Sequence, residues 1–242
     1  MQRLMSEMRA CIENYNMIEN GDKICVGVSG GKDSVTLLAA LSNMRRFLPW
    51  EYELKAVSLN MNFGGIATDY GKIAEFCRLE NIEYKVVSTR IGEIIFDVRK
   101  ESNPCSLCSR MRRGALHDAA KEMGCNKIAL GHHLDDAVET FFMNLLRGGK
   151  IASFRPVTYL SRKDITMIRP MLYAFEKDVA RAAESAELPI VKSLCPADGV
   201  TEREKVKTLI RDLETDYDNL RNKVITALEN GNIDGWSRKS AK

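Results

Sequence analysis

The hydrophobic positions of this chain alternate between two periods, one typical of strands and the other typical of helices. Short apolar runs at residues 24–28, 54–59, 84–87 and 127–130 predict buried strands. Between these runs, apolar residues recur every three or four positions, which predicts helices. Strands that alternate with helices form a parallel sheet covered on both faces. We therefore predict an α/β fold with a doubly wound, mostly parallel sheet of about five strands.

Predicted helices occupy most of the remaining chain. Helical spacing indicates an amphipathic helix over residues 2–20 and further helices at 35–46, 68–80, 104–121, 134–146 and 175–186. A capping box at Thr201 opens a basic helix, and a last helix follows at 216–228. Two β-prone runs within 155–169 predict a hairpin. The polar tail from residue 230 is expected to fray.

Composition places the chain among ordinary globular proteins. Of its 242 residues, 45% are hydrophobic and 29% are charged. The net charge of +3 is too small to indicate nucleic-acid binding by itself. Apolar runs stay far below the ~20 residues that a membrane span needs, and the N-terminus lacks a signal-peptide core. The seven cysteines are therefore expected in the reducing cytoplasm, where clustered thiols more often bind metal or react than form disulfides.

The stretch Ser-Gly-Gly-Lys-Asp-Ser, from Ser29 to Ser34, joins the first predicted strand to a helix. Such a turn is an anion site because backbone N–H groups and the helix dipole both face the ligand. Gly30 and Gly31 let a phosphate approach the backbone closely, Lys32 adds a positive charge, and the serines add hydroxyls. The loop matches neither the Walker A pattern nor the dinucleotide-binding pattern. An ordinary strand–helix turn of small residues is the alternative interpretation.

In these six residues the chain resembles the PP-loop ATP pyrophosphatases, also called adenine nucleotide alpha hydrolases. The resemblance implies that Ser29, Gly30, Gly31, Lys32, Asp33 and Ser34 hold the phosphates of ATP. It also implies cleavage of ATP between the α and β phosphates, with transfer of AMP to an oxygen of the substrate. Mg²⁺ is expected beside the triphosphate, because it neutralises and orients phosphate oxygens.

A Cys-x-x-Cys pair, Cys105 and Cys108, opens the helix predicted after Pro104. Two thiolates at this spacing can chelate one metal or cluster, and Cys195 is the best candidate for a third ligand. A redox pair, a zinc knuckle and chance remain open as alternatives. Three thiolates suit a [4Fe–4S] cluster with one open iron, whereas a four-thiolate zinc site needs a second pair.

Further motifs resemble the tRNA 2-thiocytidine synthetase branch of the PP-loop proteins, over residues 1–228. They are Cys-Ser-Leu-Cys-Ser-Arg-Met-Arg-Arg-Gly at 105–114, Gly-His-His-Leu-Asp-Asp at 131–136, Glu-Thr at 139–140, Ile-Arg-Pro at 168–170 and Glu-Lys-Asp at 176–178. The resemblance implies that Cys105, Cys108 and Cys195 hold a [4Fe–4S] cluster. The sequence around Cys195 departs from the family, which usually continues with Gly-Ser-Gln. That departure is consistent with a sub-branch that has another target.

The resemblance also implies roles for individual side chains. Lys32, Asp33, Asp135, Asp136, Cys105 and Cys108 are the expected catalytic residues, and Ser58, Gly131 and His132 are expected to contact the nucleotide. Asp33 and Asp136 are candidate Mg²⁺ contacts. In the alternative interpretation, Asp135 only caps a helix and the histidine is buried and satisfied. A persulfide on Cys105 or Cys108 is the alternative to sulfide carried on a cluster.

Basic residues flank the cysteine pair and predict RNA contact. Arg110, Arg112 and Arg113 follow it, and Arg99 and Lys100 precede it. Arginine suits phosphate contacts, and a single-stranded tRNA loop can extend its bases into a pocket. A second stretch, at Lys205, Lys207 and Arg211, is more simply a solvated helix face. A sulfur donor, either sulfide or a cysteine desulfurase, is implied, and a homodimer is plausible.

The sequence therefore predicts an ATP-dependent, iron–sulfur enzyme that makes 2-thiocytidine in a tRNA anticodon loop. Its expected parts are an N-terminal helix (1–20), a PP-loop ATP-binding domain that carries the iron–sulfur site (21–195) and a C-terminal helical extension (196–242). Thiolation of another base or substrate, and lysidine-type ligation, are alternative reactions. A non-catalytic nucleotide or metal sensor is the alternative of a different class.

Overall fold

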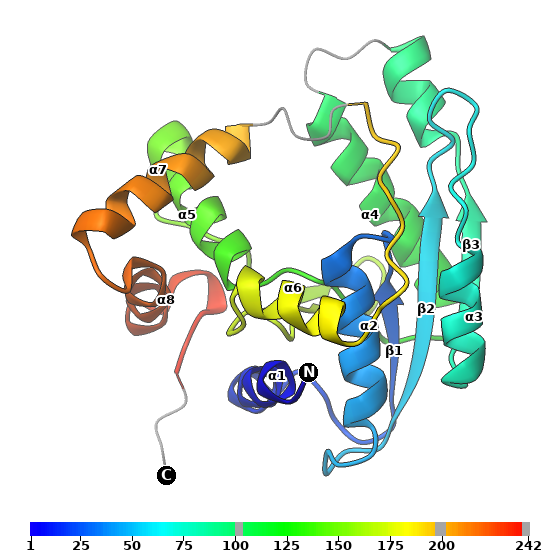
Figure 1. Cartoon of the computed structure of the whole chain (residues 1–242), viewed down its shortest axis with the longest axis horizontal. Coiled ribbons are helices and arrows are strands. Elements are labelled where there is room, and N and C mark those ends of the chain that lie inside the picture. The colour runs from blue at the N-terminus through cyan, green and yellow to red at the C-terminus, as the bar shows by residue number, and fades with distance from the viewer. Residues whose placement is uncertain (100–103, 197–201, 239–242) are drawn as a thin grey trace.

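The computed structural model describes residues 1–99, 104–196 and 202–238, and a six-stranded sheet runs through this part of the chain (Figure 1). The strands are β1 (Asp22–Gly27), β2 (Tyr52–Asn60), β3 (Glu83–Ser88), β4 (Lys127–Ala129), β5 (Val157–Leu160) and β6 (Ile165–Ile168). Their order is β3-β2-β1-β4-β6-β5. All neighbours are parallel except β5 and β6, which form the predicted hairpin. The sheet exceeds the expected five strands because both hairpin strands pair into it.

The helices follow the predicted pattern with shifted ends. They are α1 (Gln2–Tyr15), α2 (Lys32–Met44), α3 (Gly71–Leu79), α4 (Pro104–Glu122), α5 (Leu134–Gly148), α6 (Glu176–Ser185), α7 (Glu202–Asp216) and α8 (Leu220–Asn230). Two short elements were not predicted, a π-helix at Glu93–Val98 and a 3₁₀ turn at Ile233–Gly235. Helix α1 ends before residue 20 because Asn16 adopts the left-handed conformation and its N–H caps Ile12. Thr201 and its predicted capping box lie outside the described residues.

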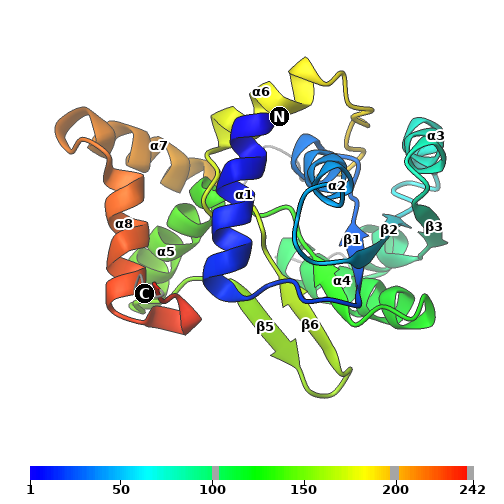
Figure 2. The same ribbon diagram turned by 90° about the horizontal axis from the view of Figure 1, so that it is seen from below.

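Two apolar layers cover the two faces of the sheet. Helix α4 packs Leu116, Ala119 and Ala120 against Cys25 and other residues of one face. The larger layer, on the other face, is formed by α1, α2, α5 and α6 (Figures 1 and 2). Both faces are therefore buried at the central strands β1 and β4, as in a doubly wound parallel sheet, whereas the edge strand β3 is mostly exposed.

The C-terminal segment is anchored rather than frayed as far as it is described. Trp236 is fully buried, its indole N–H donates to the carbonyl of Phe154 at 3.0 Å, and its ring meets Tyr15 edge-on. The hydroxyls of Tyr15 and Tyr173 both donate to the buried carboxylate of Glu229 on α8. The expectation of a loose tail is wrong there because a single tryptophan carries the packing. In the described ranges, no helix has the length and apolar character to cross a membrane.

Candidate active site at the carboxyl ends of the strands

The Ser-Gly-Gly-Lys-Asp-Ser loop joins β1 to α2, as the sequence predicts. The Ser34 hydroxyl closes the loop: it accepts from the Ser29 N–H at 3.1 Å and donates to the Gly31 carbonyl at 3.0 Å. Gly30 has a φ of +94°, which favours glycine, and Gly31 caps α2. No side chain caps α2, so its first-turn N–H groups stay directed at the loop. This geometry is the one that anion sites at helix N-termini have.

Gly131 follows β4 and lies against this loop. An added Cβ at Gly131 would stand 3.0 Å from the carbonyl carbon of Asp33 and from the nitrogen of Ser34. That distance is shorter than an ordinary van der Waals contact. The structure thus gives Gly131 a packing role, because only glycine lets the segment after β4 approach the first turn of α2 so closely.

Ser58, expected to contact the nucleotide, is fully buried near the end of β2. Its hydroxyl donates to the Val28 carbonyl at 2.7 Å and accepts from the Tyr84 hydroxyl at 2.7 Å. Both bonds lie inside the protein and fix the strand that leads into the loop. This geometry favours a positioning role for Ser58 over contact with adenine.

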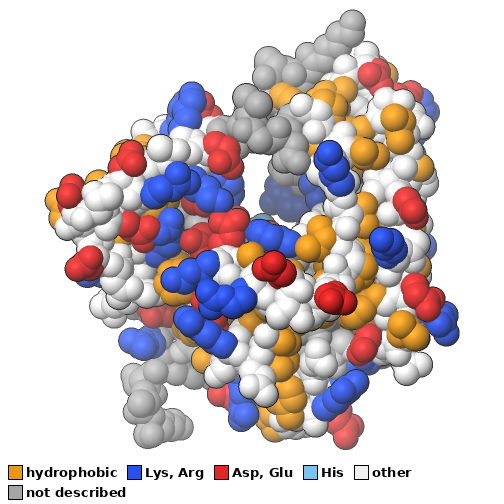
Figure 3. Space-filling model, in the orientation of Figure 1, with side chains coloured by type: hydrophobic (Ala, Val, Ile, Leu, Met, Phe, Trp, Pro, Cys, Tyr) orange, Lys and Arg blue, Asp and Glu red, His pale blue; other side chains and the backbone are white. Residues whose placement is uncertain are grey.

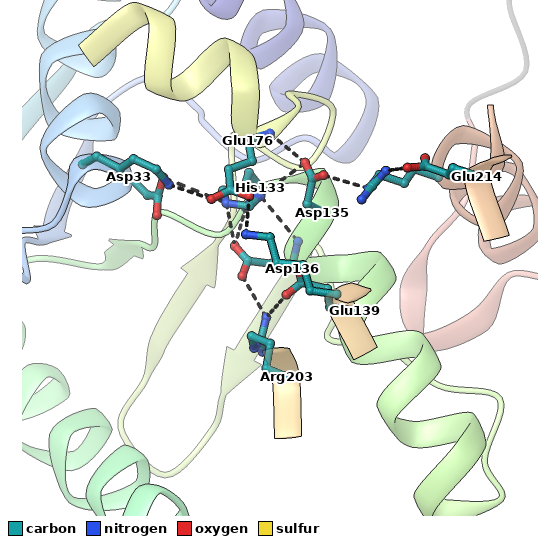
Figure 4. A network of polar contacts seen from close by, with 11 residues as sticks. Asp33, His133, Asp135, Asp136, Glu139, Glu176, Arg203 and Glu214 are labelled. Carbon is teal, nitrogen blue, oxygen red and sulfur yellow. Dashed lines mark hydrogen bonds and ion pairs between the residues drawn. The ribbon is translucent and has the colours of Figure 1, made fainter. Parts of the chain in front are cut away.

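A chain of charges runs from the loop to the C-terminal helices (Figure 4). The Lys32 ammonium contacts Asp33 at 2.8 Å and Glu176, the first residue of α6, at 3.1 Å. The other oxygen of Glu176 accepts from Lys207 of α7 at 2.7 Å. Burial acts to lower the pKa of Lys32, but both carboxylates outweigh it and raise that pKa. Burial likewise opposes ionisation of Glu176, yet Lys207 and Lys32 lower its pKa to about 2.

The alternative interpretation, in which Asp135 caps α5, is wrong, because His133 is the N-cap residue. The His133 imidazole accepts from the Asp136 N–H, and the Asp136 carboxylate accepts from the His133 N–H at 3.0 Å. Asp135 instead accepts from the Glu176 N–H at 2.6 Å and pairs with Arg221 of α8 at 2.9 Å. Asp135 is buried, and both of its oxygens are occupied, so its contacts position α6 and α8.

Asp136 and Asp33 are the more accessible carboxylates. The Asp136 side chain is 21% exposed and that of Asp33 33%, against 10% for Asp135. Arg203 of α7 bridges Asp136 at 2.9 Å and Glu139 at 3.0 Å. Burial raises the pKa of Glu139, and Arg203 opposes that rise. Oxygen ligands at these positions suit Mg²⁺.

His132 lies beside this network against Arg169 and Phe154. The Arg169 Nε–H donates to His132 Nδ1 at 3.3 Å, and the imidazole and Phe154 ring centres are 4.9 Å apart. The Arg169 guanidinium also lies 5.0 Å from the Phe154 ring centre. Burial and Arg169 lower the pKa of His132 to about 4, while burial and Arg113 lower that of Arg169 to about 10. His132 is therefore a neutral hydrogen-bonding group at pH 7, not a base.

The three cysteines of the predicted cluster site are all free and accessible. Cys105 is exposed near the start of α4, and Cys108 and Cys195 are partly exposed. Cys105 and Cys108 are one helical turn apart and so share a face of α4. Burial raises the pKa of Cys108, Arg112 opposes this, and the neighbouring thiols of Cys195 and Cys105 raise it further. Cys105 and Cys195 are thus both close enough to Cys108 to influence its ionisation.

These thiols match the donors of an iron–sulfur cluster in kind and number. They are not drawn together into a closed metal site: over the described ranges, no three His, Cys, Asp or Glu side chains form a group that could hold a metal ion. The other four cysteines, Cys11, Cys25, Cys77 and Cys125, are buried, as expected for structural residues.

The basic residues after the cysteine pair face solvent. Arg110, Arg112 and Arg113 are all exposed on α4, while Lys100 lies outside the described residues. Figure 3 shows a hollow between the α4 side and the α7 side of the molecule, with Lys or Arg side chains on its floor. Of the second basic stretch, Lys205 pairs only with Glu202 on its own helix, whereas Lys207 reaches Glu176.

Comparison with known proteins agrees with this geometry. The model of the PP-loop domain family matches residues 2–211. The chain belongs to the PP-loop family. A protein of Syntrophotalea carbinolica named tRNA-cytidine(32) 2-sulfurtransferase is 42% identical over 223 residues, which cover 90% of this chain and 85% of the relative. A protein of the same name from Dechloromonas aromatica is 38% identical and covers 90% and 76%. This PP-loop protein therefore belongs to the branch of these sulfurtransferases.

A solved structure of a PP-loop protein shares the architecture. The U34-tRNA thiolase NcsA from Methanococcus maripaludis, solved with its [4Fe-4S] cluster, superposes with a TM-score of 0.74 at 26% identity. The match covers 93% of this chain and 77% of that chain. The predicted α/β fold is thereby confirmed.

Sequence reasoning missed several residues of the charge network. Arg203 and Arg221 received no role, Lys207 was assigned to a solvated face, and Glu176 was quoted only within a motif. Local pattern carries no signal for these contacts, since Lys32 and Glu176 are 144 positions apart. Arg169 lay in the quoted Ile-Arg-Pro motif, and an arginine beside a buried strand is itself a signal of a buried polar partner.

Proposed function

We propose that this PP-loop protein is an ATP-dependent tRNA sulfurtransferase that replaces the C2 oxygen of a cytidine in the anticodon loop with sulfur. The observation that carries the proposal is the link between the anion loop and the cysteine segment. The Val191 N–H donates to the Gly30 carbonyl at 2.9 Å, and Cys195 follows four residues later with its thiol accessible. The loop proposed to bind ATP and the segment that carries Cys195 are therefore neighbouring parts of one site.

The first half of the reaction makes the oxygen a leaving group. The C2 oxygen attacks the α-phosphorus of ATP, the bond to the β-phosphate breaks, and pyrophosphate leaves. Lys32 and the first-turn N–H groups of α2 stabilise the phosphate charge as it moves. Asp33 and Asp136 are the proposed Mg²⁺ contacts, whereas Asp135 holds the helices that carry them. His132 offers a neutral hydrogen bond to the nucleotide.

The second half replaces AMP with sulfur. Cys105, Cys108 and Cys195 would hold a [4Fe–4S] cluster, which would supply the sulfur as sulfide. Sulfur attacks C2 of the activated base and AMP departs with the former C2 oxygen. The accessible thiols and the absence of any disulfide among the seven cysteines support this ligand set.

The proposed partners follow from charge and chemistry. Arg110, Arg112 and Arg113 bind phosphates of the tRNA loop next to the cysteines. A sulfide source or a cysteine desulfurase supplies the sulfur. The protein works in the cytoplasm, and a homodimer that shares the tRNA is part of the proposal.

The test combines anaerobic reconstitution with mass spectrometry of tRNA nucleosides. Protein loaded with iron and sulfide is incubated with tRNA, ATP and Mg²⁺, and both 2-thiocytidine and pyrophosphate are measured. We expect both products to require tRNA, and Cys195→Ser to abolish 2-thiocytidine. Cys77→Ser is the matched control, since its thiol is buried and not among the proposed ligands. Pyrophosphate release without any thiolated nucleoside would refute the thiolation reaction.

A further inference from the structure

We infer that Arg203 and Lys207 of α7 bind the β and γ phosphates of ATP, so that the C-terminal helices complete the nucleotide site. The inference rests on the proposed ATP site and extends it to residues outside the predicted ATP-binding domain. Figure 4 shows Arg203 directed at Asp136 and Glu139 of α5, and Lys207 contacts Glu176 of α6. They are four positions apart and therefore share one face of the helix.

Lys207 is joined to the loop through one carboxylate. One carboxylate oxygen of Glu176 accepts from the Lys32 ammonium at 3.1 Å, and the other accepts from the Lys207 ammonium at 2.7 Å. The two ammonium groups thus flank a single anion at the mouth of the loop. A phosphate group, like the Glu176 carboxylate, has anionic oxygens that accept hydrogen bonds from ammonium groups. The phosphates of an ATP molecule that extend beyond the loop would therefore meet the same two cations, Lys32 and Lys207.

Arg203 makes the matching contact on the other side of the site. Its guanidinium bridges Asp136 and Glu139 at 2.9 and 3.0 Å. Asp136 is also a proposed Mg²⁺ contact, and a metal ion at Asp136 competes with Arg203 for the carboxylate. The guanidinium then has phosphate oxygens as its nearest alternative partners, for which its planar donors are well suited.

The basic side chains of α7 differ in how far they are exposed to solvent. Lys205 has a side chain that is 74% exposed and pairs, within the described part of the chain, only with Glu202 one turn away. The side chains of Lys207 and Arg203 are 31% and 37% exposed. Placing two cations in this partly buried position is costly unless they meet anions there. The helix buries Val206 and Ile210 beneath them, which fixes the direction in which they point.

Nucleotide titrations of the full-length chain test the inference. Affinities for AMP and for an ATP analogue with a methylene between the α and β phosphates are measured by calorimetry in the presence of Mg²⁺. We expect Lys207→Met to weaken binding of the analogue about tenfold, the usual worth of one charge-assisted hydrogen bond, with AMP unchanged. Arg203→Met is expected to act in the same way, Lys207→Arg to keep most of the affinity, and Lys205→Met to bind as the unaltered protein does.

Two other results would overturn the inference, and a third would overturn the proposed ATP site. Unchanged analogue affinity in Lys207→Met and Arg203→Met overturns the inference. An equal loss for AMP and for the analogue also overturns it, because that pattern indicates a general distortion of the site. If the unaltered protein binds neither nucleotide, the proposed ATP site itself is wrong, and the failure lies with the proposed function.

Discussion

Replacement of Gly131 by alanine tests whether the contact between the segment after β4 and the first turn of α2 sets the shape of the PP-loop. The new Cβ would lie 3.0 Å from backbone atoms of Asp33 and Ser34, and ordinary contacts begin at 3.4 Å. The first turn of α2 must therefore shift by the difference, 3.4 minus 3.0, or about 0.4 Å. Overpacking of this kind costs about 1–3 kcal/mol of unfolding free energy. For a chain of this size, each kcal/mol lowers Tm by roughly 2–4 °C.

Nucleotide affinity should fall as well, because the shifted turn carries the N–H groups that face the phosphates. We expect about a tenfold loss of affinity, which corresponds to the weakening of roughly one hydrogen bond to a charged group. Urea unfolding and calorimetric titration with an ATP analogue measure the two effects. Gly114→Ala is the control: Gly114 lies within α4 and an added Cβ meets no heavy atom within 4 Å. It should keep its affinity and gain up to about 1 kcal/mol. A Gly131→Ala protein as stable and as well bound as the control would refute the packing argument.

Three further predictions concern other parts of the molecule. Trp236→Ala should lose about 3–5 kcal/mol in urea unfolding, and Trp236→Phe much less, because the ring is fully buried; a loss below about 1 kcal/mol would contradict its anchoring role. The pKa of Glu176 falls from 4.5 to about 2 on folding, so its ionised form stabilises the protein above pH 4.5 and loses that effect as the pH falls toward 2. The stability difference from Glu176→Gln, measured by urea unfolding across this range, should shrink accordingly, and a pH-independent difference would be inconsistent with the ion pairs. In a thiol-reagent assay, three cysteines should react quickly and four only after denaturation, and any other division would contradict the described burial.

Helix ends show how far local pattern reaches. The apolar spacing located every long helix, yet it placed the end of the first helix at residue 20 instead of Tyr15. The left-handed Asn16 ends it, and an asparagine in a polar stretch gives only a weak signal of that kind. The sequence predicted that a side chain caps the N-terminus of α5, but it did not identify which one. Histidine is an uncommon N-cap residue, and two aspartates, which are common N-cap residues, lie beside it.

By itself, the sequence determined the order of strands and helices, the anion loop and the exposed cysteine pair. These features depend on residues close together in the chain, where periodicity and turn chemistry act directly. Tertiary structure alone decided that Lys207 faces the PP-loop while Lys205 faces solvent. The two lysines are only two positions apart, and they differ in surroundings because burial of Val206 and Ile210 sets the rotation of α7. Packing between distant elements, rather than local sequence, therefore brings the C-terminal helix to the site.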